Sequence, residues 1–217
     1  MYRALLFDLD GTLAETDSLH LPTWVDALEP YGVEVDEEFY KQSISGRSTS
    51  EIIRDLLPDL GDQEGRSLGD AKEARFRERA SELEPLPGLA DFVERGRERG
   101  MRIGLVTNAP GENVEAILLA LKIRELFDTV VLADEVEAVK PHPAPYEAAL
   151  RKTGIAAEEA LAFEDSVSGI SSSVAAGVPT VGITSSQNPE RLLDAGAFMT
   201  AGDFTDPRIR ALIHGPG

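Results

Sequence analysis

Short apolar runs alternate with helical patterns along most of the chain, and this alternation limits the fold more than any other feature. The first run, residues 3–9, ends at a glycine turn, and the second, residues 101–107, follows a helical segment that ends at Gly100. Further predicted strands cover residues 130–132, 160–163 and 180–183, and predicted helices cover residues 88–99, 112–121, 145–152 and 167–176. Because strands that alternate with helices are joined by right-handed crossovers, we expect an α/β fold whose mostly parallel sheet is covered on both faces.

One long segment, residues 14–86, interrupts this alternation with helical patterns and no convincing strand. Connections within an α/β unit are usually only a few residues long, so this segment is too long to be a loop. Its helical signals are a pattern at residues 22–31, a capping box at residues 48–51 and a charged helix at residues 70–84. We therefore predict an α-helical cap at residues 14–86, inserted into a core formed by residues 1–13 and 87–217.

The charge of the chain argues against binding to nucleic acid. Its 21 Lys and Arg residues and 39 Asp and Glu residues give a formal net charge of −18, whereas phosphate backbones are bound by concentrated basic residues. A small anionic substrate is compatible with this charge, because a metal ion and one or two lysines create a local positive site. The N-terminal run is too short and too acidic for a signal peptide or a membrane span, so we expect a cytoplasmic protein without a membrane partner. A monomer is the default expectation, although no feature of the sequence indicates the oligomeric state.

Two carboxylates, Asp8 and Asp10, lie at the end of the first apolar run, directly before Gly11 and Thr12. Ligands of open α/β sheets bind beyond the carboxyl ends of the strands. Since side chains alternate along a strand, the two acids start on the same face. Such a pair offers a carboxylate nucleophile beside a proton donor. The simpler interpretation is an aspartate-rich strand end that caps a turn.

Three further features favour a site at this edge of the predicted sheet. They are the end of the second run at Thr107 and Asn108, Lys140 ahead of a predicted helix, and the acidic pair Glu164 and Asp165 after the fourth run. Each feature taken alone has a simpler explanation, namely a turn, a solvated lysine or a helix cap. Their shared position at one edge of one sheet favours a common site.

Four motifs occur in order along the chain: DLDGT, VTN, Lys140-Pro141 and FEDS. This ordered set resembles the haloacid dehalogenase superfamily, in its phosphatase and β-phosphoglucomutase-like branch with a helical cap after the first strand. The resemblance covers essentially the whole chain. It implies a Rossmann-like, doubly wound core in which the first and fourth strands are adjacent, and a Mg²⁺-dependent phosphatase that acts on a small phosphorylated metabolite.

The resemblance also implies a role for each motif residue. Asp8 would be the nucleophile, Asp10 the general acid and base, Thr107 a ligand of the phosphoryl oxygens, and Lys140 the cation between nucleophile and phosphate. Mg²⁺ would be bound by Asp8, Asp165 and the backbone carbonyl of Asp10, with Glu164 assisting directly or through water. Oxygen ligands of this kind suit Mg²⁺. Members of the superfamily that dehalogenate lack an acid at the position of Asp10, so dehalogenation is not expected.

Four residues are predicted to contact the substrate: Asn108, Arg47, Lys72 and His20. Arg47 lies in a loop that faces the active site in related sugar-phosphate enzymes, and Lys72 resembles the cap lysine of the family. His20, together with Thr16, resembles the hinge of β-phosphoglucomutase, in which the histidine bonds the general acid in the open form. Each has a simpler interpretation: Arg47 as a surface arginine, Lys72 as an exposed ion-pair partner and His20 as a structural histidine.

Hydrolysis of a sugar phosphate or a phosphoglycolate-like monoester through an aspartyl-phosphate is the leading functional prediction. The alternative is a β-phosphoglucomutase-type mutase, which Thr16, His20 and Lys72 support. Against it, Ala109 and Pro110 lack the polar side chains that such a mutase needs for a second phosphate. A third alternative is a non-catalytic binding protein, because a fold alone does not fix a function.

Overall fold

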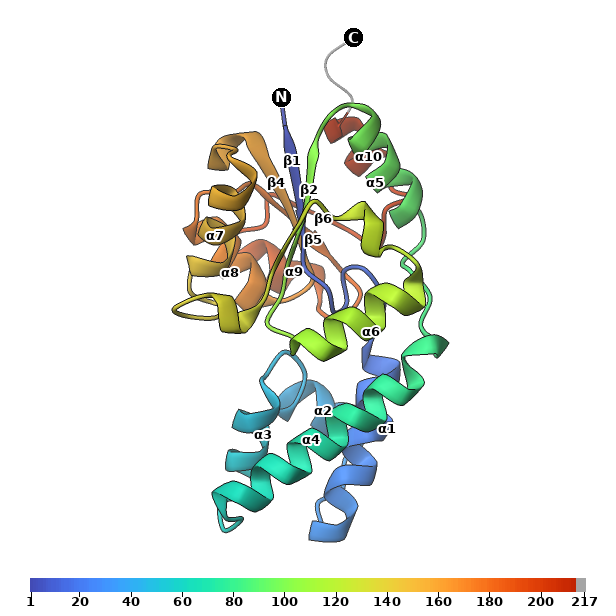
Figure 1. The fold of residues 1–217 in the computed structure, drawn as a ribbon, viewed down its shortest axis with the longest axis vertical. Coiled ribbons are helices and arrows are strands. Elements are labelled where there is room, and N and C mark those ends of the chain that lie inside the picture. The colour runs from blue at the N-terminus through green and yellow to red at the C-terminus, as the bar shows by residue number, and fades with distance from the viewer. Residues whose placement is uncertain (214–217) are drawn as a thin grey trace.

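Within residues 1–213, which the computed structural model describes, six strands form one parallel sheet in the order β3-β2-β1-β4-β5-β6 (Figure 1). The strands are β1 Ala4–Phe7, β2 Arg102–Val106, β3 Thr129–Val131, β4 Ala160–Glu164, β5 Thr180–Ile183 and β6 Met199–Ala201. Each neighbouring pair runs parallel. The expected α/β fold with adjacent first and fourth strands is therefore confirmed.

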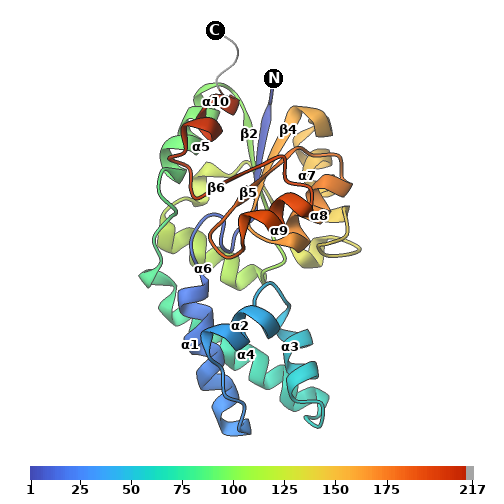
Figure 2. The same cartoon turned by 180° about the vertical axis from the view of Figure 1, so that it is seen from behind.

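Helices cover both faces of this sheet (Figures 1 and 2). They are α5 Leu89–Glu98, α6 Gly111–Leu121, α7 Ala144–Thr153, α8 Val167–Ala175, α9 Pro189–Asp194 and α10 Pro207–Ile213, with short 3₁₀ turns at Arg124–Leu126, Ala133–Glu135 and Ala157–Glu159. Side chains of β1 alternate between the two layers: Leu5 and Phe7 pack with α5, α6 and α10, and Ala4 and Leu6 pack with α7. Burial on both faces explains why these strands read as continuous apolar runs.

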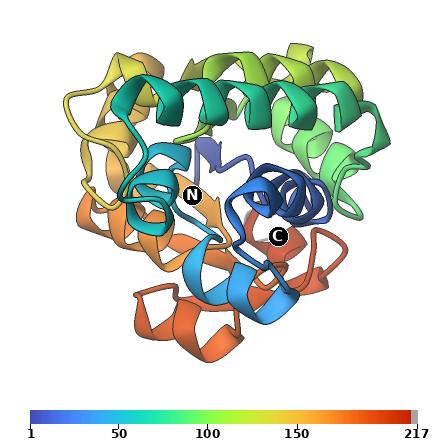
Figure 3. The same ribbon diagram turned by 90° about the horizontal axis from the view of Figure 1, so that it is seen from below.

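A helical unit follows β1 and lies beyond the carboxyl edge of the sheet (Figures 1 and 3). Its helices are α1 Asp17–Leu28, α2 Glu37–Ser43, α3 Thr49–Leu56 and α4 Asp62–Arg79, with 3₁₀ turns at Glu29–Tyr31 and Ala80–Glu82. The unit has its own apolar cluster around Trp24, Tyr40 and Ile52. The two connections to the core lie side by side, since Ala14 bridges to Pro85 and the Leu86 amide donates to the Leu13 carbonyl at 2.8 Å.

The structure agrees with most of the predicted elements and corrects others. Each of the five predicted strands lies within two residues of its observed bounds, and the capping box at Ser48 and Glu51 is present. The charged helix predicted at residues 70–84 is wrong in its bounds, because α4 begins at Asp62 and ends at Arg79. Glycine lowers helix propensity, yet Gly69 is where α4 passes close to α3: a Cβ atom there would lie 3.1 Å from the Thr49 methyl group.

Strand β6 and helix α2 are among the elements that were not predicted. Strand β6 is three residues long and pairs at the sheet edge with β5, so its sequence alone carries little signal. Helix α2 is seven residues long, and its N-terminus is capped by the Asp36 side chain, which accepts from the Phe39 amide at 2.7 Å. Among residues 1–213, none of the helices combines the length and apolar character needed to cross a membrane.

Candidate active site

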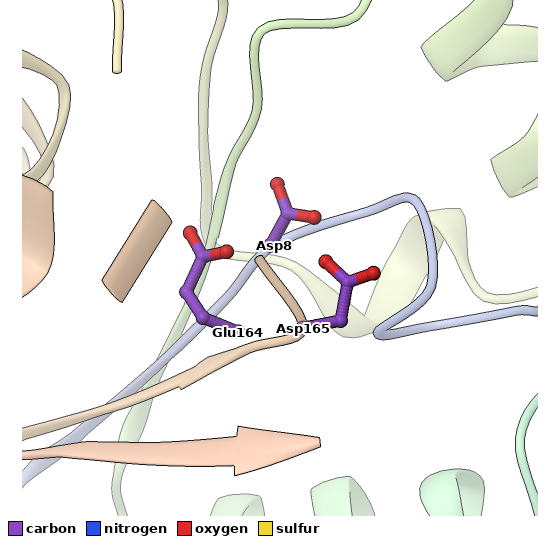
Figure 4. Close-up of side chains that lie close together, drawn as sticks. All are labelled: Asp8, Glu164 and Asp165. Carbon is purple, nitrogen blue, oxygen red and sulfur yellow. The ribbon is translucent and has the colours of Figure 1, made fainter. Parts of the chain in front are cut away.

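Three carboxylates gather at the carboxyl edge of the sheet, where β1 and β4 end side by side (Figure 4). Asp8 follows β1, Glu164 ends β4, and Asp165 comes directly after it. Each side chain offers one oxygen, and these oxygens lie within 4.8 Å of one another. The pairing of Phe7 with Phe163 fixes this meeting, because the next residue on each strand is the acid.

Lys140 is the buried cation of this cluster, with 4% of its side chain exposed. Its ammonium donates to Asp8 Oδ1 at 2.5 Å, to Glu164 Oε1 at 2.6 Å and to the carbonyl of Val106 at 2.7 Å. These bonds use all three of its protons. Burial acts to lower the pKa of Lys140, but Asp8 and Glu164 outweigh it and raise the pKa above its usual value, so the ammonium stays charged.

Asn108, predicted as a substrate ligand, lines the cavity described below and contacts the backbone of Lys140. Its Oδ1 accepts from the Lys140 amide at 3.2 Å, and its Nδ2 donates to the Lys140 carbonyl at 3.3 Å. The side chain therefore ties the end of β2 to the segment that carries the lysine. Its neighbour Thr107 is also buried, and Thr107 Oγ1 accepts from the Ala109 amide at 3.0 Å. That bond leaves the hydroxyl proton of Thr107 available for another acceptor.

The buried carboxylates outnumber the cation beside them. Burial and the charge of Glu164 raise the pKa of Asp8 to about 8, although Lys140 opposes that shift. Burial and the charge of Asp8 likewise raise the pKa of Asp165 well above its usual range. A divalent cation between Asp8 and Asp165 would balance this excess of negative charge, and the all-oxygen donor set fits Mg²⁺.

Glu164 is fully buried, and its contacts anchor Lys140. Its Oε1 accepts from Lys140 and from the Tyr146 hydroxyl, the latter at 2.5 Å. Its Oε2 lies against Gly169 in the first turn of α8, where a Cβ atom would be only 1.8 Å away. Both oxygens are thus enclosed by the core, which favours an indirect contribution of Glu164 to metal binding over direct ligation.

Asp165 is also held in place by contacts that the sequence did not indicate. Ser186 Oγ donates to Asp165 Oδ2, and a Cβ atom at Gly11 would lie 2.0 Å from that same oxygen. Gly11 also has a φ of +69°, a conformation that favours glycine. Neither Ser186 nor Tyr146 carries a motif signal, because each reaches the site only through the folding of distant segments.

Asp10 lies between the core and the helical unit. Its Oδ1 accepts from Thr16 Oγ1 at 2.8 Å and lies 3.7 Å from His20 Nε2. Burial acts to raise the pKa of Asp10, but His20, Thr16 and Lys72 together outweigh it and lower the pKa. Asp10 is therefore held as a carboxylate, with the His20 imidazole beside it.

A cavity of about 950 Å³ separates the core cluster from the helical unit. Core residues at its floor include Asp8, Thr107 and Lys140, and helical residues that line it include Arg47, Lys72 and Trp24. All of the predicted site residues except Glu164 line this cavity. The structure thus brings the other predicted catalytic residues and the predicted substrate residues to one partly open cavity.

Comparison with known proteins identifies the family of the chain. The haloacid dehalogenase-like hydrolase family matches residues 5–183. The chain belongs to this family. Protein CbbY of Cereibacter sphaeroides is 35% identical over 189 residues, which cover 82% of this chain and 82% of CbbY. Fructose-1-phosphate phosphatase YqaB of Escherichia coli strain K12 is 32% identical over 186 residues, which cover 84% of this chain and 96% of YqaB.

A solved structure of this hydrolase family extends the comparison to the ligand-bound state. A CbbY mutant from Rhodobacter sphaeroides, crystallised with xylulose-(1,5)bisphosphate, matches with a TM-score of 0.83 at 29% identity, covering 95% of this chain and 96% of that chain. Together with the phosphatase relatives, the family match shows that the chain is an enzyme, a phosphoric monoester hydrolase of the haloacid dehalogenase-like type.

The structure shows the surroundings of the three predicted substrate residues of the helical unit. Lys72 is not a solvated ion-pair partner, since it is 2% exposed and faces the cavity. Arg47 lines the cavity with its guanidinium held by Asp55 and by the Ser43 carbonyl, the latter at 2.8 Å. His20 stacks on Phe76 with ring centroids 4.0 Å apart. Substrate contact by these residues stays a prediction.

Proposed function

We propose that this hydrolase removes phosphate from a small phosphorylated sugar in a Mg²⁺-dependent reaction. The observation that carries the proposal is the contact of Lys140 with Asp8 at the floor of a cavity that the helical unit encloses. The names of two relatives support the substrate class, since one is a fructose-1-phosphate phosphatase and the other was crystallised with a sugar bisphosphate.

In this proposal, Asp8 attacks the phosphorus atom and Asp10 completes the proton transfers. The P–O bond to the sugar breaks as the Asp8 carboxylate bonds to phosphorus. Asp10, a carboxylate in this structure, must first take up a proton from solvent, and it gives that proton to the leaving alkoxide. A water molecule then attacks the aspartyl-phosphate, gives its proton to Asp10 and releases inorganic phosphate. The Thr107 hydroxyl donates to a phosphoryl oxygen, and Lys140 reduces repulsion between the carboxylate and the phosphate.

Magnesium would be held by Asp8, by Asp165 and by the backbone carbonyl of Asp10. When bound, it supplies positive charge to the phosphoryl oxygens. Ser186 and Gly11 support this assignment, because they fix the Asp165 carboxylate toward the cavity. Glu164 contributes by keeping the Lys140 ammonium in place.

Phosphate release from a panel of phosphorylated sugars, with and without chelator, tests this proposal. We expect steady release that excess chelator removes and Mg²⁺ restores. Calcium should inhibit, because it takes more ligands in a looser geometry than Mg²⁺. Full activity in excess chelator would contradict the metal assignment, and no release from any member of the panel would contradict the substrate class.

A sugar phosphomutase is the second candidate. Thr16 Oγ1 donates to Asp10 and His20 Nε2 lies 3.7 Å from it, and these contacts could prevent Asp10 from activating water until a sugar binds. A mutase also needs a second phosphate grip, and Ala109 and Pro110 offer no side-chain donor beside Thr107. A coupled glucose 6-phosphate dehydrogenase assay with β-glucose 1-phosphate and a trace of the 1,6-bisphosphate separates the candidates. Glucose 6-phosphate that forms faster than free phosphate would make this enzyme a mutase.

Replacement of Arg47 by Ala should lower kcat/KM for the best sugar phosphate by about tenfold or more, the effect of one charge-assisted hydrogen bond. The same variant should change kcat/KM for p-nitrophenyl phosphate little, because that substrate has no distant polar group for Arg47 to bind. Arg75→Ala is the matched control, since Arg75 is exposed on α4 and lies outside the cavity. Equal losses on both substrates would indicate a structural role for Arg47.

A further inference from the structure

The carboxylate of Glu73 joins three helices at the boundary between the helical unit and the core. Glu73 lies on α4, and its Oε1 accepts from the Thr49 hydroxyl at the start of α3 and from Lys72 Nζ at 3.1 Å. Its Oε2 accepts from Asn113 Nδ2 of the core helix α6 at 2.7 Å. Glu73, Lys72 and Asn113 are all buried, and Asn113 is 2% exposed. Both oxygens of this buried carboxylate accept hydrogen bonds, from three donors in all. Such a complete network fixes the position of the Glu73 side chain.

The docking of α4 on α6 makes this contact between the two parts of the molecule. The two helices run alongside each other, α4 in the helical unit and α6 in the core (Figures 1 and 3). Arg77, one turn after Glu73, donates to Asn113 Oδ1 at 3.1 Å and forms an ion pair with Glu112 at 3.0 Å. Asn113 therefore has its donor and its acceptor engaged by the same face of α4.

Glu73 also favours the protonated form of Lys72. The lysine ammonium lies 5.0 Å from the centroid of the Trp24 ring and 5.8 Å from that of Phe76, out of contact with bulk water. Burial lowers the pKa of Lys72, and the negative charge of Glu73 opposes that shift. Glu73 itself keeps its charge: burial acts to raise its pKa, but Lys72, Thr49 and Asn113 outweigh it and lower the pKa.

Lys72 in turn determines which nitrogen of His20 carries a proton. Its Nζ lies 2.9 Å from His20 Nδ1. An ammonium group can only donate, so Nδ1 must accept and the proton of a neutral imidazole must be on Nε2. That nitrogen is the one that faces Asp10 Oδ1, at 3.7 Å.

We propose that Glu73 is a positioning residue for proton transfer. Asn113 of the core fixes the Glu73 carboxylate, and that carboxylate fixes the Lys72 ammonium. Lys72 in turn keeps the His20 proton on Nε2, the nitrogen that faces Asp10. Asn113 is the member of this relay that lies on the core helix α6, so the position of Glu73 depends on the contact between α4 and α6. Thr49 extends the relay to the loop that carries Arg47, because Thr49 is the first residue of α3. The proposal rests on the proposed role of Asp10 as acid and base.

The test compares Glu73→Gln with Glu78→Gln, the same substitution at an exposed position of the same helix that lies outside the cavity. In Glu73→Gln, kcat/KM for the sugar phosphate with the fastest release should fall about tenfold or more, as expected for a misplaced proton-transfer group. For p-nitrophenyl phosphate it should change less than about twofold, because that leaving group needs little protonation. Glu78→Gln should match the unaltered enzyme on both substrates.

A second measurement observes the His20 ring directly. The chain contains three histidines, so a long-range ¹H–¹⁵N spectrum is simple to assign with a His20→Asn variant. At a pH where the ¹⁵N shifts show a neutral ring, His20 should be protonated on Nε2 in the unaltered enzyme, because its Nδ1 faces Lys72 Nζ. The fraction of His20 in the Nε2-protonated form should fall in Glu73→Gln. It should also fall in Asn113→Asp, because that substitution places a second carboxylate beside Glu73.

Asn113→Asp also keeps the test valid if Glu73→Gln does not fold, because an acid in the first turn of α6 is favourable for the helix itself. The proposal is overturned if both folded variants keep the Nε2 tautomer, or if they lose activity equally on the two substrates. If the unaltered enzyme releases phosphate from no sugar phosphate, the proposed function fails, and the His20 spectrum still tests the relay.

Discussion

Asp8→Asn should reduce phosphate release by about a thousandfold or more while the protein stays folded. The substitution removes the negative charge that attacks phosphorus at nearly constant volume. An asparagine oxygen can still accept the proton that Lys140 Nζ donates at 2.5 Å to Asp8 Oδ1. It also relieves the repulsion from Glu164 that raises the pKa of Asp8 to about 8 together with burial. Thermal unfolding should therefore shift only slightly, whereas a phosphate assay should detect almost no turnover.

Asp194→Asn is the control for this variant, because Asp194 is exposed on α9 and lies outside the cavity. It should keep full activity. Removal of a nucleophile should leave far less than about a hundredth of the normal rate. If purified Asp8→Asn kept more than that, Asp8 would not be the nucleophile.

Gly169→Ala should reduce both the stability and the activity of the enzyme. The added Cβ would lie 1.8 Å from Glu164 Oε2 and 2.1 Å from its Cδ, so the carboxylate must move. Glu164 cannot move without leaving Lys140 and the Tyr146 hydroxyl, which its Oε1 binds at 2.6 and 2.5 Å. Breaking a buried ion pair in this way costs about 3 kcal/mol or more. Displacement of Lys140 should also lower kcat/KM by about a hundredfold.

Denaturant unfolding and phosphate release measure these two effects. Gly111→Ala is the matched control, since Gly111 is also in the first turn of a core helix and its Cβ would meet only the Leu132 methyl group, at 3.2 Å. That variant should stay within about 1 kcal/mol of the unaltered enzyme. A Gly169→Ala protein as stable and active as this control would show that Glu164 has room to move.

The sequence predicted the parallel core because its signals are local. Residues 160–163 are apolar throughout, and residues 180–183 carry no charged side chain and one polar residue, Thr180, because strands buried on both faces favour apolar side chains. Asp8, Lys140 and Asp165 could be placed at one edge for the same reason: each follows or precedes a recognisable element, and carboxyl ends of parallel strands share an edge. The capping box at Ser48 is equally local, because all of its contacts fall within four residues.

Tertiary structure alone decided which side chains complete the site. Tyr146, Ser186 and Asn113 have no motif of their own, and their importance comes from contacts with Glu164, Asp165 and Glu73 across distant parts of the chain. Gly169 appears in the sequence as an ordinary residue of a helix, yet its missing side chain is what leaves room for a buried carboxylate. Local pattern fixes which elements form, whereas the docking of α4 on α6 and of α8 on β4 depends on packing between segments that the sequence does not place together.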